Sequence, residues 1–516
     1  MNFRHVARIL AGFVAFFSVV QLVPLALALR EESAEAVSSQ QGFFAGIVTG
    51  AAVAAVLFAL GRRARGELFR RETLLIAGVA WLAAGVIGAV PFFGSGLLRD
   101  PADALFESVS GLTTCGGTVL GCAGNPAPEA TPPSLLLWRA MLQWLGGIGI
   151  VLAFVALMPS MGRAGKNLLM AESVGVSSEG YQPRIRTRAH GIALVYVGLT
   201  ALCAVALVFF GGMSWFDAIC HAFTCLATGG FSTRTNVALF DSLGVEIVLT
   251  TFMFIGGCSF TVMAGVARDG WTGLRGMLRS GEFRIYTLFT AGAILLVGID
   301  LMRRGAGLGA ALRESSFNVV SMLSCCGYAT ADFHVWPPLS LIVIVTCSMV
   351  GGCSGSAAGG LKQVRLLVCL KLLGHTVRRF VQPNLVERIK LDEEVLQAST
   401  LSTVLSVVLL WMLTILLGSM VLALDQRLSF VGCISASASM LGGCGPALAA
   451  VHPDMLLQPL PTLGVGVDVV GPNIGPFGGY GDLSNLSKLA MCLQMVLGRL
   501  ELLPILALFA PRFWQR

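Results

Sequence analysis

Four segments of the sequence share a short apolar stretch that ends in small, hydroxyl or thiol residues and then a glycine. They read LFESVSGLTTCGGT (105–118), WFDAICHAFTCLATGGFS (215–232), SFNVVSMLSCCGYA (316–329) and SFVGCISASASMLGGCGP (429–446). Helix-start residues precede three of them: Asp100-Pro101, Ser214 and Ser429. A helix of roughly 12–15 residues rises only about 20 Å, too little to cross a hydrocarbon layer of about 30 Å. The pattern predicts four reentrant hairpins.

The predicted turning glycines are Gly116, Gly229, Gly327 and Gly445, which recur at intervals of about 100–120 residues. Non-helical backbone at membrane depth is tolerated only where it is buried in protein or lines a watery cavity. Backbone carbonyls from four such loops can replace the water around a dehydrated monovalent cation, and helix C-termini add partial negative charge. Close helix packing would explain a single glycine. Four in register favour a cation pathway.

Charged residues accompany these hairpins. Asp103, Glu107 and Asp217 lie near the outer ends of the short helices. They could concentrate cations, or they could simply follow the preference of acids for a helix N-terminus. Arg139 follows the first hairpin and is expected to snorkel to the outer membrane interface.

A run of small residues, GGCSGSAAGG (351–360), interrupts a later apolar segment. Such a run cannot hold a stiff helix, because each glycine costs up to about 1 kcal/mol relative to alanine. It could be a mobile gate, or a point where helices cross closely. Lys362 and Arg365 follow it. Arg499, within the last apolar segment, is expected to face the protein interior or a cavity, or to pair with Glu501.

The composition requires a membrane around these elements. Of 516 residues, 55% are hydrophobic and 12% are charged, and the mean hydropathy is +0.80. Soluble domains carry about twice that share of charge. Ten apolar segments are long enough, some marginally, to span a bilayer. They are 6–29, 43–61, 73–94, 134–158, 191–211, 245–267, 286–301, 337–375 (interrupted), 401–424 and 486–509. The first is expected to be a retained helix, since it is too long for a signal peptide.

Most of the 35 lysines and arginines fall in segments on one face of this arrangement. This bias predicts that both termini lie in the cytoplasm. The net charge of +7 resides in those loops and favours lipid or protein partners over nucleic acid. The 14 cysteines fall mostly in apolar runs and are expected to be buried small hydrophobes, whereas Cys122 lies on a polar loop and has no predicted place.

The sequence gives weaker support to three other functions. A serine protease would use the G-x-S-G wording of 352–355, but the six histidines include none well inside a regular span to act as base. A carrier with alternating access would need membrane carboxylates or inverted repeats, whereas these spans are nearly free of acids and the repeats keep one orientation. A membrane scaffold would transport nothing. The sequence favours a transport protein that is not an enzyme.

Several long motifs occur in one order along the whole chain. They are GLTTCGGT (111–118), LQWLGGIGI (142–150), TGGFST (228–233), ATADF (329–333), GGCSGSAAGGLKQVR (351–365) and GRLE (498–501). In these motifs the chain resembles the Trk/Ktr/HKT superfamily of potassium transport proteins, most closely the TrkH family.

The resemblance implies an all-α polytopic membrane protein with a pseudo-fourfold repeat of helix, pore helix, filter loop and helix around an ion pore. The implied units are an N-terminal helix pair (1–72) and four pore repeats (73–160, 161–268, 269–392 and 393–516). It also implies potassium uptake across the bacterial cytoplasmic membrane, a homodimer, and a cytosolic nucleotide-binding regulatory partner of the TrkA type. Potassium ions in the filter would be bound without any other cofactor.

Matched by motif, the resemblance assigns three sets of residues. The filter carbonyls would come from Thr114, Cys115, Gly116, Ala227, Thr228, Gly229, Cys325, Cys326, Gly327, Gly443, Cys444 and Gly445. The gate would comprise Gly351, Gly352, Ser354, Gly355, Ser356, Gly359, Gly360 and Lys362. Arg499 would lie near the pore beneath the filter.

The sequence departs from the family pattern in two places. Cysteine precedes three of the four glycines, which puts filter rigidity and selectivity in doubt, and thiolates would instead suit Cu(I) or zinc. After Gly445 comes a long outer stretch, 447–485, without Lys or Arg, whose NIGP (473–476) imitates the fourth filter loop. Gly445 is preferred over Gly475 because a pore helix can precede it. The sequence leaves open the ratio of potassium to sodium and whether transport is coupled to another ion.

Overall fold

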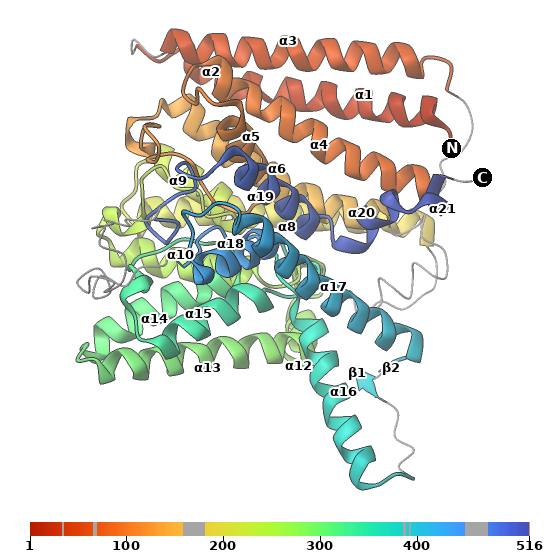
Figure 1. The fold of residues 1–516 in the computed structure, drawn as a ribbon, viewed down its shortest axis with the longest axis vertical. Coiled ribbons are helices and arrows are strands. Elements are labelled where there is room, and N and C mark those ends of the chain that lie inside the picture. Colours follow the sequence, from red (N-terminus) through yellow and green to blue (C-terminus); the bar gives the residue numbers. More distant parts are fainter. Residues whose placement is uncertain are drawn as a thin grey trace.

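The computed structural model describes residues 1–32, 36–64, 70–157, 181–384, 389–391, 394–448 and 473–514. These residues are mostly helical, as predicted for an all-α membrane protein. The N-terminal helices α1 (Phe3–Val20), α2 (Leu22–Ala28) and α3 (Ala36–Gly61) lie together along one side of the molecule (Figure 1). Glycines let them approach closely: a Cβ on Gly50 would overlap the side chain of Ser18.

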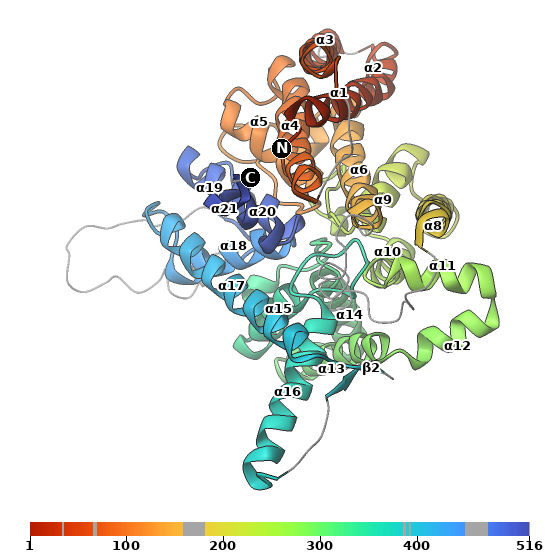
Figure 2. The same cartoon turned by 90° about the vertical axis from the view of Figure 1, so that its right-hand side faces the viewer.

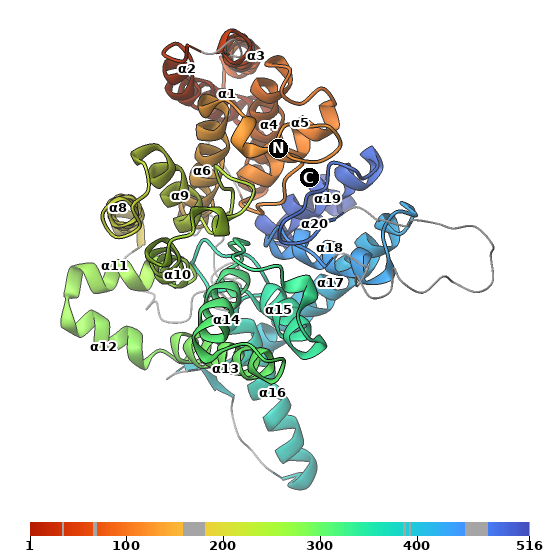
Figure 3. The ribbon, with the colours of Figure 1, turned by 90° about the vertical axis from the view of Figure 1, so that its left-hand side faces the viewer.

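Four units of similar design follow. Each has a first long helix, a short helix, a loop, and a second helix. The first helices are α4 (Arg70–Gly94), α8 (Tyr181–Phe209), α13 (Gly281–Arg303) and α17 (Ala398–Leu422). The short helices are α5 (Pro101–Leu112), α9 (Trp215–Leu226), α14 (Leu308–Leu323) and α18 (Phe430–Gly442). Figures 2 and 3 show the units placed around a common centre, viewed along the long helices from opposite ends.

The second helices differ from one unit to the next. In the first unit α6 (Pro133–Leu157) is continuous. The others are α10 (Leu243–Gly256) with α11 (Phe260–Asp269), α15 (Pro338–Val350) with α16 (Gln363–Val381), and α19 (Asn485–Arg499) with α20 (Leu502–Phe509). The side that carries the loops from short to second helices is called the outer side below. Both termini lie at the opposite, inner side (Figure 1).

Two of the ten predicted spans are wrong as straight helices. Residues 245–267 bend by 97° between α10 and α11, and 486–509 bend by 114° between α19 and α20. The first bend follows the glycine pair Gly256-Gly257, and the second has Glu501 at a positive φ of 59°. Of the described residues, six helices are long and apolar enough to cross a membrane, or up to eight if each bent pair is one span. The interruption predicted in the eighth span is confirmed.

The start signals of the short helices act as predicted. Asp100 accepts a hydrogen bond from the Ala102 amide (2.8 Å), and Ser429 accepts one from the Gly432 amide (3.0 Å). Ser214 caps α9 in the same way. The third short helix, α14, begins at Leu308, earlier than the quoted segment 316–329. Side-chain caps therefore begin three of the four short helices, whereas α14 follows Gly307 without one.

The remaining elements lie away from the common centre of the four units. Helix α12 (Trp271–Arg279) joins α11 to α13, and α21 (Pro511–Trp514) ends the chain. Strands β1 (Lys390–Leu391) and β2 (Glu394–Val395) pair antiparallel. Short 3-10 turns, η1 (Pro128–Ala130), η3 (Val237–Phe240) and η4 (Phe333–Val335), lie in the outer connections. Helix α16 projects away from the body (Figure 1).

Candidate ion pathway

The four loops that follow the short helices have one backbone conformation. In each, two residues with positive φ, near 50–70° and near 80–86°, flank a single residue. These pairs are Thr114 and Gly116, Thr228 and Gly230, Cys325 and Gly327, and Gly443 and Gly445. The residue between them donates its amide hydrogen to the short helix that precedes it: Cys115 to Ser110 (2.9 Å), Gly229 to Thr224 (2.8 Å), Cys326 to Ser321 (2.9 Å) and Cys444 to Ser439 (3.0 Å). The internal repeat is therefore a repeat of atomic geometry.

The second loop shows that the predicted register is shifted by one residue. Gly230, with φ 80°, holds the position of Gly116, whereas Gly229 matches Cys115. Ala227 then lies one residue before the first positive-φ residue, Thr228. Two glycines are adjacent here, and the sequence does not show which of them takes the positive φ.

The loops meet one another in a closed ring. A Cβ on Gly116 would overlap the carbonyl oxygen of Gly229, and one on Gly230 would overlap that of Cys326. In the same way Gly327 faces Cys444, and Gly445 faces Cys115. Each loop thus presents a carbonyl oxygen to the glycine of a neighbouring loop. Only glycine fits these positions, because of both the conformation and the space.

A cavity of about 60 Å³ opens from this ring to the outer side. Its lining includes Gly116, Gly230, Gly327 and Gly445. Non-helical backbone that lines a polar cavity at the centre of a helical membrane protein fits a site where an ion exchanges its water for peptide oxygens. The fourth position is held by Gly445. The alternative, Gly475, instead packs against the ring of His334.

Side chains of the short helices hold the outer ends of the loops. Glu107 accepts hydrogen bonds from the Val119 amide (2.9 Å) and the Thr118 hydroxyl (3.0 Å). At the equivalent position of α14, Asn318 accepts from the Thr330 amide (3.3 Å). In α9 the equivalent residue is His221, whose Nε2 lies 3.0 Å from the Ser232 hydroxyl. In three units, a different side chain at the same position of the short helix therefore forms a hydrogen bond to the outer end of the loop.

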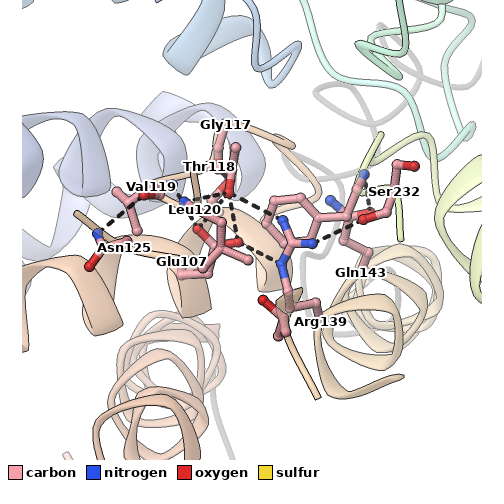
Figure 4. A network of polar contacts seen from close by, with 12 residues as sticks. Glu107, Gly117, Thr118, Val119, Leu120, Asn125, Arg139, Gln143 and Ser232 are labelled. Carbon is pink, nitrogen blue, oxygen red and sulfur yellow. Dashed lines mark hydrogen bonds and ion pairs between the residues drawn. The ribbon is translucent and has the colours of Figure 1, made fainter. Parts of the chain in front are cut away.

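Arg139, on α6, joins the first two loops, and the expectation that it snorkels to the interface is wrong. It is 2% exposed and forms an ion pair with Glu107 (Nε–Oε1 2.7 Å). Its guanidinium also donates to the Ser232 carbonyl (3.1 Å) and stacks over the Phe231 ring, 4.0 Å from the centroid. Figure 4 shows this network. Because a carboxylate, a carbonyl oxygen and an aromatic ring stabilise the buried guanidinium, the side chain of Arg139 does not extend to water.

The acids near the outer ends of the short helices have partners. Glu107 is paired with Arg139, and Asp103 forms a buried ion pair with Lys488 of α19. Asp217 accepts from the Thr233 hydroxyl (2.6 Å). Ion pairing was not anticipated for these residues, because the partners lie far away in sequence.

Charge also joins the second and third units. Glu246 of α10 accepts two hydrogen bonds from Arg313 of α14, at 2.6 and 2.7 Å. The pair of Lys488 and Asp103 joins the fourth and first units with the charges exchanged. In both cases a second helix binds the short helix of the next unit.

The break loop, residues 351–362, lies against the inner side of the ring. Gly351, Gly355, Gly360 and Lys362 all have φ between 72° and 76°. The Gly360 amide donates to the carbonyl of Gly442 (2.8 Å), the last residue of α18. The loop is thereby tied to the short helix that carries the fourth filter loop.

Further contacts fix the break loop to other units. The Cys353 amide donates to Gly257 (2.8 Å) at the bend after α10, and the Ser354 amide donates to Glu282 of α13 (2.6 Å). The residues that the sequence predicts as a gate therefore form one continuous loop, and this loop contacts several units. A displacement of this loop would break each of these contacts.

Arg499 connects the break loop to α6. It is 8% exposed and donates to the carbonyls of Ala357 (2.6 Å) and Gly146 (3.0 Å). The alternative of a pair with Glu501 is not what the structure shows, since Glu501 pairs with Arg365 (2.7 Å). Among the described residues its hydrogen-bond partners are carbonyl oxygens, which do not neutralise the charge of a guanidinium.

The cysteines of the filter loops, Cys115, Cys325, Cys326 and Cys444, are buried. The thiol of Cys444 lies 3.5 Å from the carbonyl oxygen of Ser348 on α15, behind the ring. Within the described ranges, no group of three or more His, Cys, Asp or Glu could hold a metal ion. Cys122 is half-buried and packs beside Gly479 and Gly481.

Two residues of the site were missed. Gln143, on α6, bonds to the second filter loop, and Gly230 completes the ring. A lone amide within the apolar stretch LQWLGGIGI was the available signal for Gln143. Most of the predicted outer insertion 447–485 lies outside the described residues. The unit boundaries remain predictions.

Comparisons with known proteins agree with this arrangement. Residues 38–459 match the family model of TrkH, described as a cation transport protein. The chain is 32% identical to the Trk system potassium uptake protein TrkH of Halomonas elongata and 33% identical to that of Escherichia coli K12, in both cases over the full length of each chain. The crystal structure of the potassium transporter TrkH from Vibrio parahaemolyticus superposes with a TM-score of 0.85, 28% identity and full coverage of both chains. The chain belongs to the TrkH family of cation transport proteins, which are membrane transporters and not enzymes.

Proposed function

We propose that the protein takes up potassium through the ring of four loops. The observation that carries this proposal is the closed sequence of contacts in which each ring glycine faces a carbonyl oxygen of a neighbouring loop. Carbonyl oxygens in such a ring can replace the hydration shell of a potassium ion. The relatives from Halomonas elongata and Escherichia coli are potassium uptake proteins by name. Potassium in the filter is the only bound ligand that this function needs.

The filter oxygens would come from the residues predicted from sequence, with the second loop read in its structural register. That reading gives Thr228, Gly229 and Gly230 in place of Ala227, Thr228 and Gly229. The thiols behind the ring favour peptide oxygens over thiolates as the ion's ligands, because the sulfur of Cys444 is directed at Ser348. Coordination by backbone does not depend on the side chain.

The break loop would act as the gate of this pathway. It contacts the last residue of α18 and is bound by Arg499, so its position is coupled to the ring and to a fixed positive charge. A guanidinium beneath the ring opposes the passage of a cation. Movement of the loop with its bound arginine would lower that barrier.

The protein would lie in the bacterial cytoplasmic membrane, surrounded by lipid, with both termini in the cytoplasm. The two termini lie on the same side, and the basic segments predict that this side is cytoplasmic. By resemblance, a homodimer would bind a TrkA-type nucleotide-binding subunit at this face. Helix α16, which projects from the body and carries Lys371, Arg378 and Arg379, offers a basic surface for such a partner.

Growth of a bacterium that lacks potassium uptake tests this function directly. We expect the protein to restore growth at limiting potassium and to carry rubidium into proteoliposomes, with a rate that depends little on pH. A rate that follows the proton gradient would instead support a coupled carrier. No rubidium flux from correctly folded protein, with its partner subunit and nucleotide present, would disprove transport.

A further inference from the structure

Helix α6 directs two side chains at the second filter loop. Arg139 and Gln143 are one helical turn apart and therefore lie on one face. Gln143 is fully buried, and its amide Nε2 donates to the carbonyl oxygen of Gly229 (2.7 Å). Its Oε1 accepts from the amide of Phe231 (3.1 Å). The two hydrogen bonds lie on either side of Gly230 and hold its positive φ in place. Figure 4 shows Gln143 beside this loop.

This contact explains why residue 229 is a glycine. The equivalent residue of the other three loops is a cysteine, with its side chain packed behind the ring. A Cβ on Gly229 would overlap the amide group of Gln143. The second loop therefore lacks the cysteine side chain of the other three loops and contacts the amide of Gln143 on α6 instead.

This contact makes one oxygen of the ring different from its equivalents. Gly229 contributes the same carbonyl as Cys115, Cys326 and Cys444, and of these four only Gly229 accepts a side-chain hydrogen bond within the described part of the chain. A carbonyl that already accepts a hydrogen bond offers a weaker field to an ion. Weaker ligands favour potassium over sodium, because sodium gives up more hydration energy when it sheds water.

We propose that Gln143 is a specificity-determining residue of the filter: its amide weakens and fixes the Gly229 oxygen and so favours potassium over sodium. This inference rests on the potassium function proposed above and assigns part of its selectivity to one side chain. Gln143 acts through Gly229 and Phe231 and does not itself touch the ion.

Replacing Gln143 by methionine, which has a similar volume and no donor, tests the inference. Rubidium uptake into proteoliposomes, measured in competition with sodium and with potassium, gives the preference between the two ions. We expect Gln143→Met to lower the preference for potassium about fivefold, the ratio that corresponds to a hydrogen bond of about 1 kcal/mol. An unchanged preference in folded protein would overturn the proposal.

Gln494 provides a matched control. It is also a buried glutamine on a second helix, α19, and its Nε2 donates to the Ser437 hydroxyl (2.7 Å) on α18, away from the ring. We expect Gln494→Met to leave the ion preference as in the wild type. If both substitutions changed the preference equally, lost packing would be the cause and the inference would fail.

Gln143→Glu separates hydrogen bonding from packing. A protonated glutamic acid can donate to the Gly229 oxygen and accept from the Phe231 amide, whereas the carboxylate cannot donate. We expect the potassium preference of this variant to approach that of the wild type as the pH falls and to decrease as the pH rises. The wild type contains the neighbouring groups Glu107, Arg139 and His221 but not the new acid, so it serves as the reference at each pH. A preference in this variant that tracked the wild type at every pH would contradict the proposal.

The outcomes separate the two proposals. Wild-type protein that carries no rubidium would refute the potassium function itself. Wild-type protein that transports and prefers potassium, together with a Gln143→Met variant of equal preference and equal thermal unfolding, would refute only the role of Gln143.

Discussion

The outer and inner halves of the molecule hold their backbone in opposite ways. In the outer half, buried ion pairs join the filter loops and short helices, as Arg139 with Glu107 and Lys488 with Asp103 show. In the inner half, three of the four second helices bend or break. Among the described residues, buried polar atoms without a hydrogen-bond partner include Ser354 Oγ, Gln363 Oε1 and Arg499 Nε in the inner half, and also Ser439 Oγ on the short helix α18.

The difference follows from what each half has to do in a transporter. A ring of carbonyls must keep its spacing to distinguish ions, and charge-assisted hydrogen bonds such as that of Arg139 with Glu107 support it. A gate must exchange one set of contacts for another at little cost, so glycine turns and incompletely satisfied groups are suited to it. If the proposed filter and gate are correct, we expect the outer half to be the more rigid and the inner half the more adaptable.

The largest effect should come from removing one partner of a buried pair in the outer half. Arg139→Met leaves Glu107 buried without its cation, which typically costs about 3–5 kcal/mol. We expect a corresponding loss in the free energy of unfolding, measured by denaturation in detergent. The double variant with Glu107→Gln should recover much of it. A single variant as stable as the wild type would show that the outer half does not depend on this pair.

The next effect concerns the ring itself. Gly230→Ala forces a side chain into a positive φ and against the Cys326 oxygen, at a cost of about 1–3 kcal/mol. We expect rubidium uptake to fall roughly tenfold to a hundredfold. Gly117→Ala is the control, because Gly117 does not have a positive φ and the added Cβ would meet side chains, the end of Met440 and the ring of Tyr480, and no backbone oxygen. Equal loss from both substitutions would contradict the structural register.

A smaller effect is expected in the inner half. Arg499→Gln removes the charge and weakens the hold on Ala357 of the break loop. We expect basal rubidium flux to rise about fivefold, as for the loss of one hydrogen bond of about 1 kcal/mol, with the potassium preference unchanged. A change in preference without a change in basal flux would place Arg499 with the filter and not with the gate.

The smallest effects compare one hydroxyl from each half. Ser110 in the outer half donates to the Gly117 carbonyl (2.5 Å), whereas the Ser354 hydroxyl in the break loop makes no hydrogen bond within 3.5 Å to the described residues. Ser110→Ala should reduce the free energy of unfolding by about 1 kcal/mol. Ser354→Ala should leave it within about 0.5 kcal/mol of the wild type. The reverse order would mean that the two halves are not held differently.

Much of the fold could be predicted because its signals are local. Apolar length, the four short helices and their start residues, and the glycine break at 351–360 are properties of neighbouring residues, and they predicted a pseudo-fourfold membrane protein. Long motifs in order, such as 351–365, predicted the family. Local signals also predicted glycine turns, since a positive φ is a requirement of the single residue.

Local signals could not decide between partners. Two adjacent glycines, Gly229 and Gly230, look alike in sequence, and only their neighbours in space distinguish them: Gly229 faces the amide of Gln143 and Gly230 faces the Cys326 oxygen. The bends after α10 and α19 depend on how distant segments pack, and apolar composition is the same for a straight or a bent helix.

The sequence by itself determined that this chain needs a membrane, repeats one unit around a centre, and turns back at glycines. Only the tertiary structure decided which carbonyl faces which glycine, which charge is buried with which, and what holds the break loop. The reason is physical: apolar composition and backbone turns depend on the residues themselves and their neighbours in the chain, whereas hydrogen bonds and ion pairs such as that of Lys488 with Asp103 depend on neighbours in space.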